Sequence, residues 1–162
     1  MTDFKYFVDT APYIYCLEGE KASDLTKRAK TFFKNEFSNG ATFVTSSITF
    51  EEYLVHPYRD KDDACVSRFY GFIKTTETSV IHIDEKIADR ASRIRAEYTS
   101  FRAMDALQLA TACETGCDIF LTNDKRLRQF KDIKISVLEE LPFDDAIEPT
   151  SSLASPSGEI TP

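Results

Sequence analysis

Short apolar segments that alternate with longer amphipathic ones constrain the fold of this chain more than any other feature. The short segments are rich in aromatic and β-branched residues, which predicts strands at 4–8, 42–45, 79–83, 119–121 and 133–138. The intervening segments place apolar residues at helical spacing, which predicts helices over 21–37, 49–55, 60–73, 84–98, 103–114 and 125–130. We expect the second helix to end before Pro57, because the residue ahead of a proline disfavours α conformation. Strands joined by helices form a parallel sheet covered on both faces, so the fold class is α/β, a three-layer α/β/α sandwich.

The charge distribution divides the chain into a domain and a tail. The 162 residues carry a net charge of −7 and suit one domain. Six of the 27 acids and none of the 20 bases lie between Glu139 and Pro162, which leaves 21 acids against 20 bases elsewhere. We therefore expect a nearly neutral domain over 1–141, which has room for a basic patch. Residues 142–162, rich in Pro, Ser, Thr and acids, are typical of a disordered tail.

Several functional classes are excluded by what the sequence lacks. It has no Gly-rich phosphate loop, no apolar run long enough for a transmembrane helix, and no visible secretory signal. Its four cysteines form no C-x-x-C pair, and its two histidines are far apart, so a zinc site is not indicated. Free thiols in a reducing cytoplasm are the expectation, with no membrane partner.

Acidic residues follow the predicted strands at the positions where α/β proteins carry their chemistry. Asp9 ends the first strand, Glu51 and Glu52 lie on the helix after the second, and Asp124 follows the fourth. Asp105 opens the helix that leads into that fourth strand. The carboxyl ends of parallel strands share one rim, so these acids are expected to converge. No histidine, cysteine or serine is expected there as a nucleophile.

Converging carboxylates repel one another, and a divalent cation relieves the repulsion. Hard cations such as Mg²⁺ or Mn²⁺ prefer oxygen ligands and support hydrolysis by activating water. Each acid also has a simpler explanation. Asp9 and Asp124 are good helix caps, one of the Glu51–Glu52 pair is expected to be a solvated surface residue, and Asp105 is tolerable in an apolar helix near its N-terminus.

A basic cluster follows the last of these acids and includes Lys125, Arg126 and Arg128. Such a cluster is either a solvated face or, beside an acidic cleft, a surface that contacts a phosphate backbone.

Four motifs in order resemble those of PIN-domain ribonucleases, and among these the VapC-like toxins of toxin–antitoxin pairs. They are Phe7-Val8-Asp9-Thr10, Ser47-Ile48-Thr49-Phe50-Glu51-Glu52, Met104-Asp105-Ala106-Leu107-Gln108-Leu109-Ala110-Thr111-Ala112 and Leu121-Thr122-Asn123-Asp124.

The resemblance implies an endoribonuclease that depends on Mg²⁺ or Mn²⁺ and cleaves RNA. It implies that Asp9, Glu52, Asp105 and Asp124 are both catalytic and metal-binding, with Glu52 matched rather than Glu51 because the pattern Ile-Thr-x-x-Glu ends there. It assigns supporting polar roles to Thr10, Thr122 and Asn123. It also implies a homodimer and an antitoxin protein that lies across the cleft.

Two alternatives stay open. A catalytically inactive PIN-like domain would serve as a binding or scaffold module, with no metal in the cleft. A phosphatase with Asp9 as nucleophile would usually carry a second acid two residues on, where this chain has Ala11.

Overall fold

A five-stranded parallel sheet forms the centre of the molecule in the computed structural model, which describes residues 3–144. The spatial order is β3-β2-β1-β4-β5, and each neighbouring pair is parallel. The strands are β1 (Lys5–Val8), β2 (Thr42–Ser46), β3 (Ser79–Ile81), β4 (Ile119–Thr122) and β5 (Lys134–Val137). All five predicted strands are therefore present.

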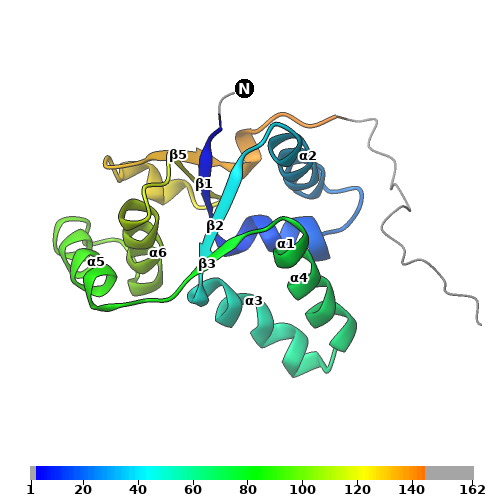
Figure 1. Ribbon diagram of the computed structural model, residues 1–162, viewed down its shortest axis with the longest axis horizontal. Coiled ribbons are helices and arrows are strands. Elements are labelled where there is room, and N and C mark those ends of the chain that lie inside the picture. The colour runs from blue at the N-terminus through cyan, green and yellow to red at the C-terminus, as the bar shows by residue number, and fades with distance from the viewer. Residues whose placement is uncertain (1–2, 145–162) are drawn as a thin grey trace, which may run out of the picture.

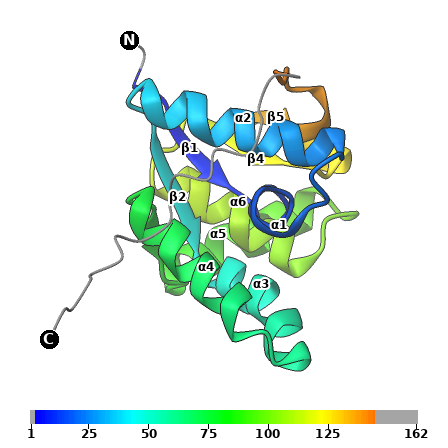
Figure 2. The same cartoon turned by 90° about the vertical axis from the view of Figure 1, so that its right-hand side faces the viewer.

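Helices cover both faces of the sheet, which confirms the three-layer α/β/α prediction (Figure 1). The helices are α1 (Thr10–Glu18), α2 (Asp24–Ser38), α3 (Ser47–Asp60), α4 (Asp63–Thr75), α5 (Glu85–Glu97) and α6 (Ala103–Glu114). Two short 3-10 helices follow, η1 (Lys125–Gln129) and η2 (Leu138–Glu140). Helices α5 and α6 lie on one side of the sheet and α1, α2 and α4 on the other, as the turned view in Figure 2 also shows.

The strand side chains divide between two hydrophobic cores. Tyr6 and Val8 of β1 point into the core shared with α1 to α4, while Phe7 points into the core shared with α5 and α6. There Phe7 stacks on Phe120 of β4 at 5.1 Å between ring centroids. Burial on both faces explains why these strands are almost continuously apolar instead of alternating with polar residues.

The helix α1 was not predicted, because its sequence is short and contains a proline. Pro12 lies in the first turn, where a proline is tolerated because the N–H it lacks would have no partner within the helix. Asp9 caps the helix by accepting a hydrogen bond from the backbone N–H of Thr10 at 2.9 Å. The first strand therefore runs directly into a helix through Asp9.

The prediction that the helix after β2 ends before Pro57 is wrong. Helix α3 continues to Asp60 and is closed by Lys61, whose φ of 56° is left-handed. Pro57 is buried on the same helical face as Tyr53 and Leu54. The packing of this face outweighs the cost of about 3 kcal/mol for a proline in a helix interior.

The start of the predicted tail lies against α2. The backbone carbonyl of Leu141 accepts a hydrogen bond from Arg28, and the Arg28 guanidinium lies 4.6 Å from the centre of the Phe143 ring. The remainder of the predicted tail, from residue 145 onwards, lies outside the described residues. The domain boundary at 141 therefore stays a prediction.

All four cysteines are free, as predicted; Cys16 and Cys65 are buried and the other two are partly buried. In residues 3–144 no helix combines the length and the apolar character that crossing a bilayer requires.

Candidate active site

The order of the strands creates a crevice at one edge of the sheet. The chain builds β1, β2 and β3 in one direction and then returns to place β4 and β5 on the other side of β1. Ligands of open α/β proteins bind outside the carboxyl ends of the strands at such a reversal point, here between β1 and β4. Asp9 lies at this point, and its backbone N–H donates to the carbonyl of Leu121 at 2.9 Å.

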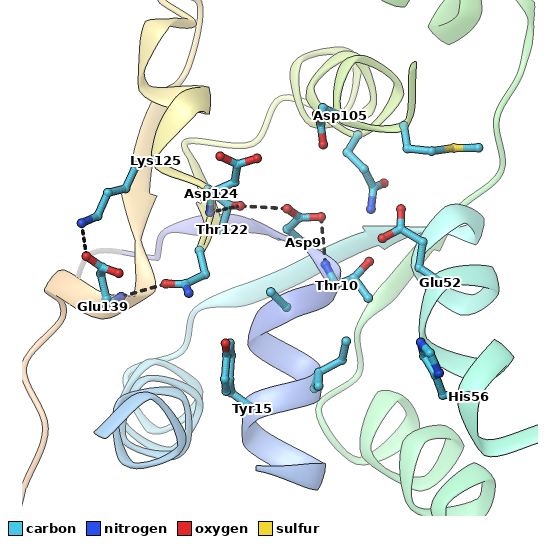
Figure 3. A pocket seen from close by; sticks show the side chains of 15 residues that line it. Asp9, Thr10, Tyr15, Glu52, His56, Asp105, Thr122, Asp124, Lys125 and Glu139 are labelled. Atoms are coloured by element: carbon cyan, nitrogen blue, oxygen red, sulfur yellow. Dashed lines mark hydrogen bonds and ion pairs between the residues drawn. The ribbon is translucent and has the colours of Figure 1, made fainter. Parts of the chain in front are cut away.

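A pocket of about 620 Å³ opens at this edge, and all four predicted acids line it. Asp9 comes from the end of β1, Glu52 from α3, Asp105 from α6 and Asp124 from the start of η1. Figure 3 shows their side chains directed towards a common space. Four carboxylates that are far apart in sequence therefore meet in one pocket.

Asp9 is held by two hydrogen bonds. Its Oδ1 accepts from the Thr10 backbone N–H and its Oδ2 accepts from the Thr122 hydroxyl at 2.8 Å. Burial raises the pKa of Asp9, the Asp105 carboxylate adds to the rise, and the hydrogen bonds oppose it. Asp9 thus combines the capping role and the pocket position that the sequence offered as alternatives.

Glu52 faces the same space from the second turn of α3. Burial and the neighbouring Asp9 raise the pKa of Glu52. Glu51, by contrast, is exposed and does not line the pocket. The structure therefore distinguishes the two adjacent glutamates in the way that the motif match does.

Asp105 and Asp124 each lie at a helix N-terminus. Asp105 is in the first turn of α6 and accepts from the Arg102 backbone N–H at 3.2 Å. Asp124 caps η1 by accepting from the Arg126 backbone N–H at 3.0 Å. The Arg126 guanidinium beside it holds the pKa of Asp124 below its usual range.

The donor set of the pocket fits a hard divalent cation. It is dominated by carboxylate oxygens, and burial and mutual repulsion raise the pKa of Asp9 and Glu52, which a positive ion would relieve. As the side chains stand, no three Asp, Glu, His or Cys residues within 3–144 are grouped closely enough to coordinate one ion. The four carboxylates thus line one pocket but are not close enough together to coordinate a single ion.

Of the three predicted supporting residues, Thr10 and Thr122 contact acids of the pocket and Asn123 does not. The Thr122 hydroxyl joins two acids, because it donates to Asp9 and accepts from the Asp124 backbone N–H at 3.1 Å. Thr10 contributes its backbone N–H to Asp9. Asn123 lines the pocket, but its side-chain oxygen accepts from the Glu139 backbone N–H at 3.2 Å and so connects to η2 instead of to an acid.

A buried polar network under the pocket was missed by sequence reasoning. Gln108 of α6 is fully buried and donates to the Thr49 hydroxyl at 2.8 Å, while its side-chain oxygen accepts from Ser46. Interaction with the Gln108 side chain also lowers the pKa of Asp9. A signal existed: Gln108 is a polar residue between Leu107 and Leu109, one turn after Asp105.

The pocket also contains groups that the sequence did not place there, among them Tyr15, His56 and Glu139. His56 lines the pocket beside the acids, although the sequence offered no reason to place a histidine there. Its position follows from the unexpected length of α3, which carries the helix past the acids to Asp60.

The predicted basic cluster is largely paired with acids. Lys125 lines the pocket and pairs with Glu139, Arg128 pairs with Glu140, and Arg126 pairs with Asp124 and Asp105. This surface therefore carries alternating charges rather than a bare positive patch.

Comparisons with known proteins agree with the fold. The family model described as PIN domain matches residues 6–133. A toxin–antitoxin complex from Klebsiella pneumoniae aligns with a TM-score of 0.63 and 22% identity, over 82% of this chain and 97% of the other. VapBC2 from Rickettsia felis, bound to a promoter DNA fragment, aligns with a TM-score of 0.68 and 16% identity, over 83% and 98%.

A third solved structure is VapC20 from Mycobacterium tuberculosis, described as a toxin that cleaves the sarcin–ricin loop. It aligns with a TM-score of 0.56 and 19% identity, over 80% of this chain and 98% of the other. No curated protein matches the sequence.

Proposed function

Because this chain belongs to the PIN-domain family, we propose that it is a divalent-metal-dependent endoribonuclease that hydrolyses RNA phosphodiester bonds. The observation that carries the proposal is the meeting of Asp9, Glu52, Asp105 and Asp124 in one pocket at the reversal point of the sheet. An acidic pocket without a cation would repel a phosphodiester, so the proposed substrate requires positive charge to be supplied there.

Mg²⁺ or Mn²⁺ would be held by these four carboxylates. When bound, such an ion supplies a water of lowered pKa and neutralises charge on the phosphate under attack.

The residues of the chain itself orient these groups. The Thr122 hydroxyl and the Thr10 N–H hold the Asp9 carboxylate in place. Glu52 has no ion-pair partner within the described residues, so its carboxylate is available to a bound cation.

Contacts with the RNA backbone are proposed for Lys125, Arg126 and Arg128. Lys125 lines the pocket, and the side chains of Arg126 and Arg128 are exposed beside it. Contacts of this kind weaken as salt concentration rises, because phosphate binding releases counterions.

We further propose that the protein is the toxin of a toxin–antitoxin pair, a cytoplasmic homodimer neutralised by a small antitoxin. The support is the similarity of the fold to proteins solved as toxin–antitoxin complexes, together with free cysteines that suit a reducing compartment.

Cleavage of RNA by the full chain with Mg²⁺ or Mn²⁺ tests the enzyme proposal. Asp105→Asn removes one ligand charge but keeps an oxygen that can accept from the Arg102 N–H, so the fold is expected to remain. The matched control is Asp89→Asn, which removes the same charge from an exposed ion pair outside the pocket. We expect EDTA and Asp105→Asn to abolish cleavage and Asp89→Asn to preserve it; activity that survives both EDTA and Asp105→Asn refutes the mechanism.

The inactive binding module is the second candidate. It is favoured by the observation that the acids are not grouped for coordination and that two of them pair with Arg126. It predicts neither cleavage nor Mn²⁺ binding, and isothermal titration calorimetry with Mn²⁺ separates the two.

A further inference from the structure

Arg126 spans two of the four acids in the pocket. Its Nε lies 3.0 Å from Oδ1 and 3.1 Å from Oδ2 of Asp124, and its Nη2 also pairs with Oδ2. The same Nη2 lies 3.5 Å from Oδ2 of Asp105 on α6. The guanidinium therefore contacts both oxygens of one proposed ligand and one oxygen of another.

This arrangement distinguishes Arg126 from the other bases of η1. Lys125 and Arg128 pair with Glu139 and Glu140, neither of which is a proposed ligand. Among the ion pairs of the described residues, only those of Arg126 involve any of the four acids of the pocket. Arg126 thus supplies the positive charge that is paired with these acids.

A guanidinium and a divalent ion compete for these oxygens. The planar donors of arginine match a carboxylate in a two-point contact, which occupies the lone pairs that a metal would use. Two positive groups at the same carboxylates would also repel.

We propose that Arg126 is the counter-cation of these acids in the metal-free protein. Its guanidinium holds Asp124 and Asp105, and it must be displaced before Mg²⁺ or Mn²⁺ binds. The inference rests on the proposed function, since it concerns how these acids receive a metal. Arg126 lowers the affinity of the pocket for divalent ions and is a positioning residue, not a ligand.

Displacement of Arg126 requires little rearrangement. Its side chain is 43% exposed, so the released guanidinium can be solvated. The cap on η1 uses the backbone N–H of residue 126, which any replacement except proline retains. Removing the side chain should therefore free the two carboxylates without unfolding the short helix.

Calorimetric titration of the full chain with Mn²⁺ alone tests the proposal. We expect Arg126→Gln to bind Mn²⁺ about 5- to 10-fold more tightly than the wild type, since a well-formed exposed charge pair is worth on the order of 1 kcal/mol. Arg126→Lys retains the charge without the two-point contact and should fall between the two.

Arg128→Gln is the matched control, because it removes the same charge from the same short helix without touching the four acids. Its effect on Mn²⁺ affinity measures the general electrostatic gain, and we expect it to be clearly smaller than that of Arg126→Gln. Circular dichroism checks that each variant is folded.

The outcomes separate the two proposals. Tighter binding by Arg126→Gln than by Arg128→Gln supports the role of Arg126. If the wild type binds Mn²⁺ and Arg126→Gln binds it equally or more weakly, the role of Arg126 is refuted while the proposed function stands. If neither protein binds Mn²⁺, the metal-dependent function fails and the role of Arg126 fails with it.

Discussion

Asp9 affects the free energy of unfolding in two opposite ways. Its side chain stabilises the protein by capping α1, and its buried negative charge destabilises it. In Asp9→Asn the side-chain oxygen can still cap α1, since Asn and Asp are comparable N-caps, while the negative charge is lost. Both variants lose the acceptor of the Thr122 hydroxyl, since Asn has only one side-chain oxygen, and Asp9→Ala loses the cap as well.

The difference between the two variants is the cap alone, because both lose the carboxylate oxygen that accepts from the Thr122 hydroxyl. A lost N-cap costs about 1 kcal/mol. We therefore expect Asp9→Asn to exceed Asp9→Ala in free energy of unfolding by about 1 kcal/mol. In a domain of this size that difference corresponds to roughly 2–4 °C in melting temperature.

The wild type should be less stable than Asp9→Asn in EDTA at neutral pH. Burial raises the pKa of Asp9 in the folded state, so folding disfavours its charged form. The resulting penalty is present above the folded pKa and disappears as the pH falls below the unfolded value of about 4. The advantage of Asp9→Asn should therefore shrink on acidification.

Urea denaturation in EDTA, repeated with excess Mn²⁺, measures both effects. Saturation with an ion at about 100 times its dissociation constant should stabilise the wild type by about 2.7 kcal/mol, whereas Asp9→Asn should gain much less. A wild type more stable than Asp9→Asn in EDTA at pH 7, or equal stability of the Asn and Ala variants, would refute this reasoning.

Three further perturbations test the scaffold. Phe69→Ala removes a fully buried ring stacked on Tyr53 at 4.1 Å and should cost about 3–5 kcal/mol in chemical denaturation; a loss below about 1 kcal/mol would contradict this packing. Hydrogen bonds from Arg68 and Tyr53 hold the pKa of Glu18 below its usual value, although burial opposes this shift. Glu18→Gln should therefore lose about 1 kcal/mol of stability above pH 5, and progressively less as acid protonates the wild type. A pH-independent difference would count against the ion pair. Gln108→Leu leaves the buried hydroxyl groups of Ser46 and Thr49 short of a partner, so it should cost about 2 kcal/mol of stability and weaken Mn²⁺ binding. An unchanged stability together with an unchanged Mn²⁺ affinity would show that the buried network does not support Asp9.

Local patterns were sufficient for most of the fold. Helix α6 has the bounds expected from its strong helix formers and the glycine after it, and Asp84 caps α5 as expected through the backbone N–H of Ile87. Pro12 and Pro57 mark where local rules failed. The first is accommodated in a helix start, and the second is retained inside α3 because its ring is buried.

The location of the acids followed from the sequence for a general reason. In a parallel sheet every strand ends at the same edge, so a residue placed just after a strand is placed at that edge whatever the details of packing. Asp9 and Asp124 could be assigned in this way from their neighbours in the chain alone.

The state of those acids was decided by tertiary structure. The bond from Thr122 to Asp9 joins residues 113 positions apart, and the Gln108 network joins α6 to the start of α3. The approach of Arg126 to Asp105 likewise depends on how η1 lies beside α6. The alternation of strands and helices determines that Asp9 and Asp124 share one edge of the sheet. Hydrogen bonds and ion pairs act over a few ångströms, so only the folded packing determines what each acid contacts.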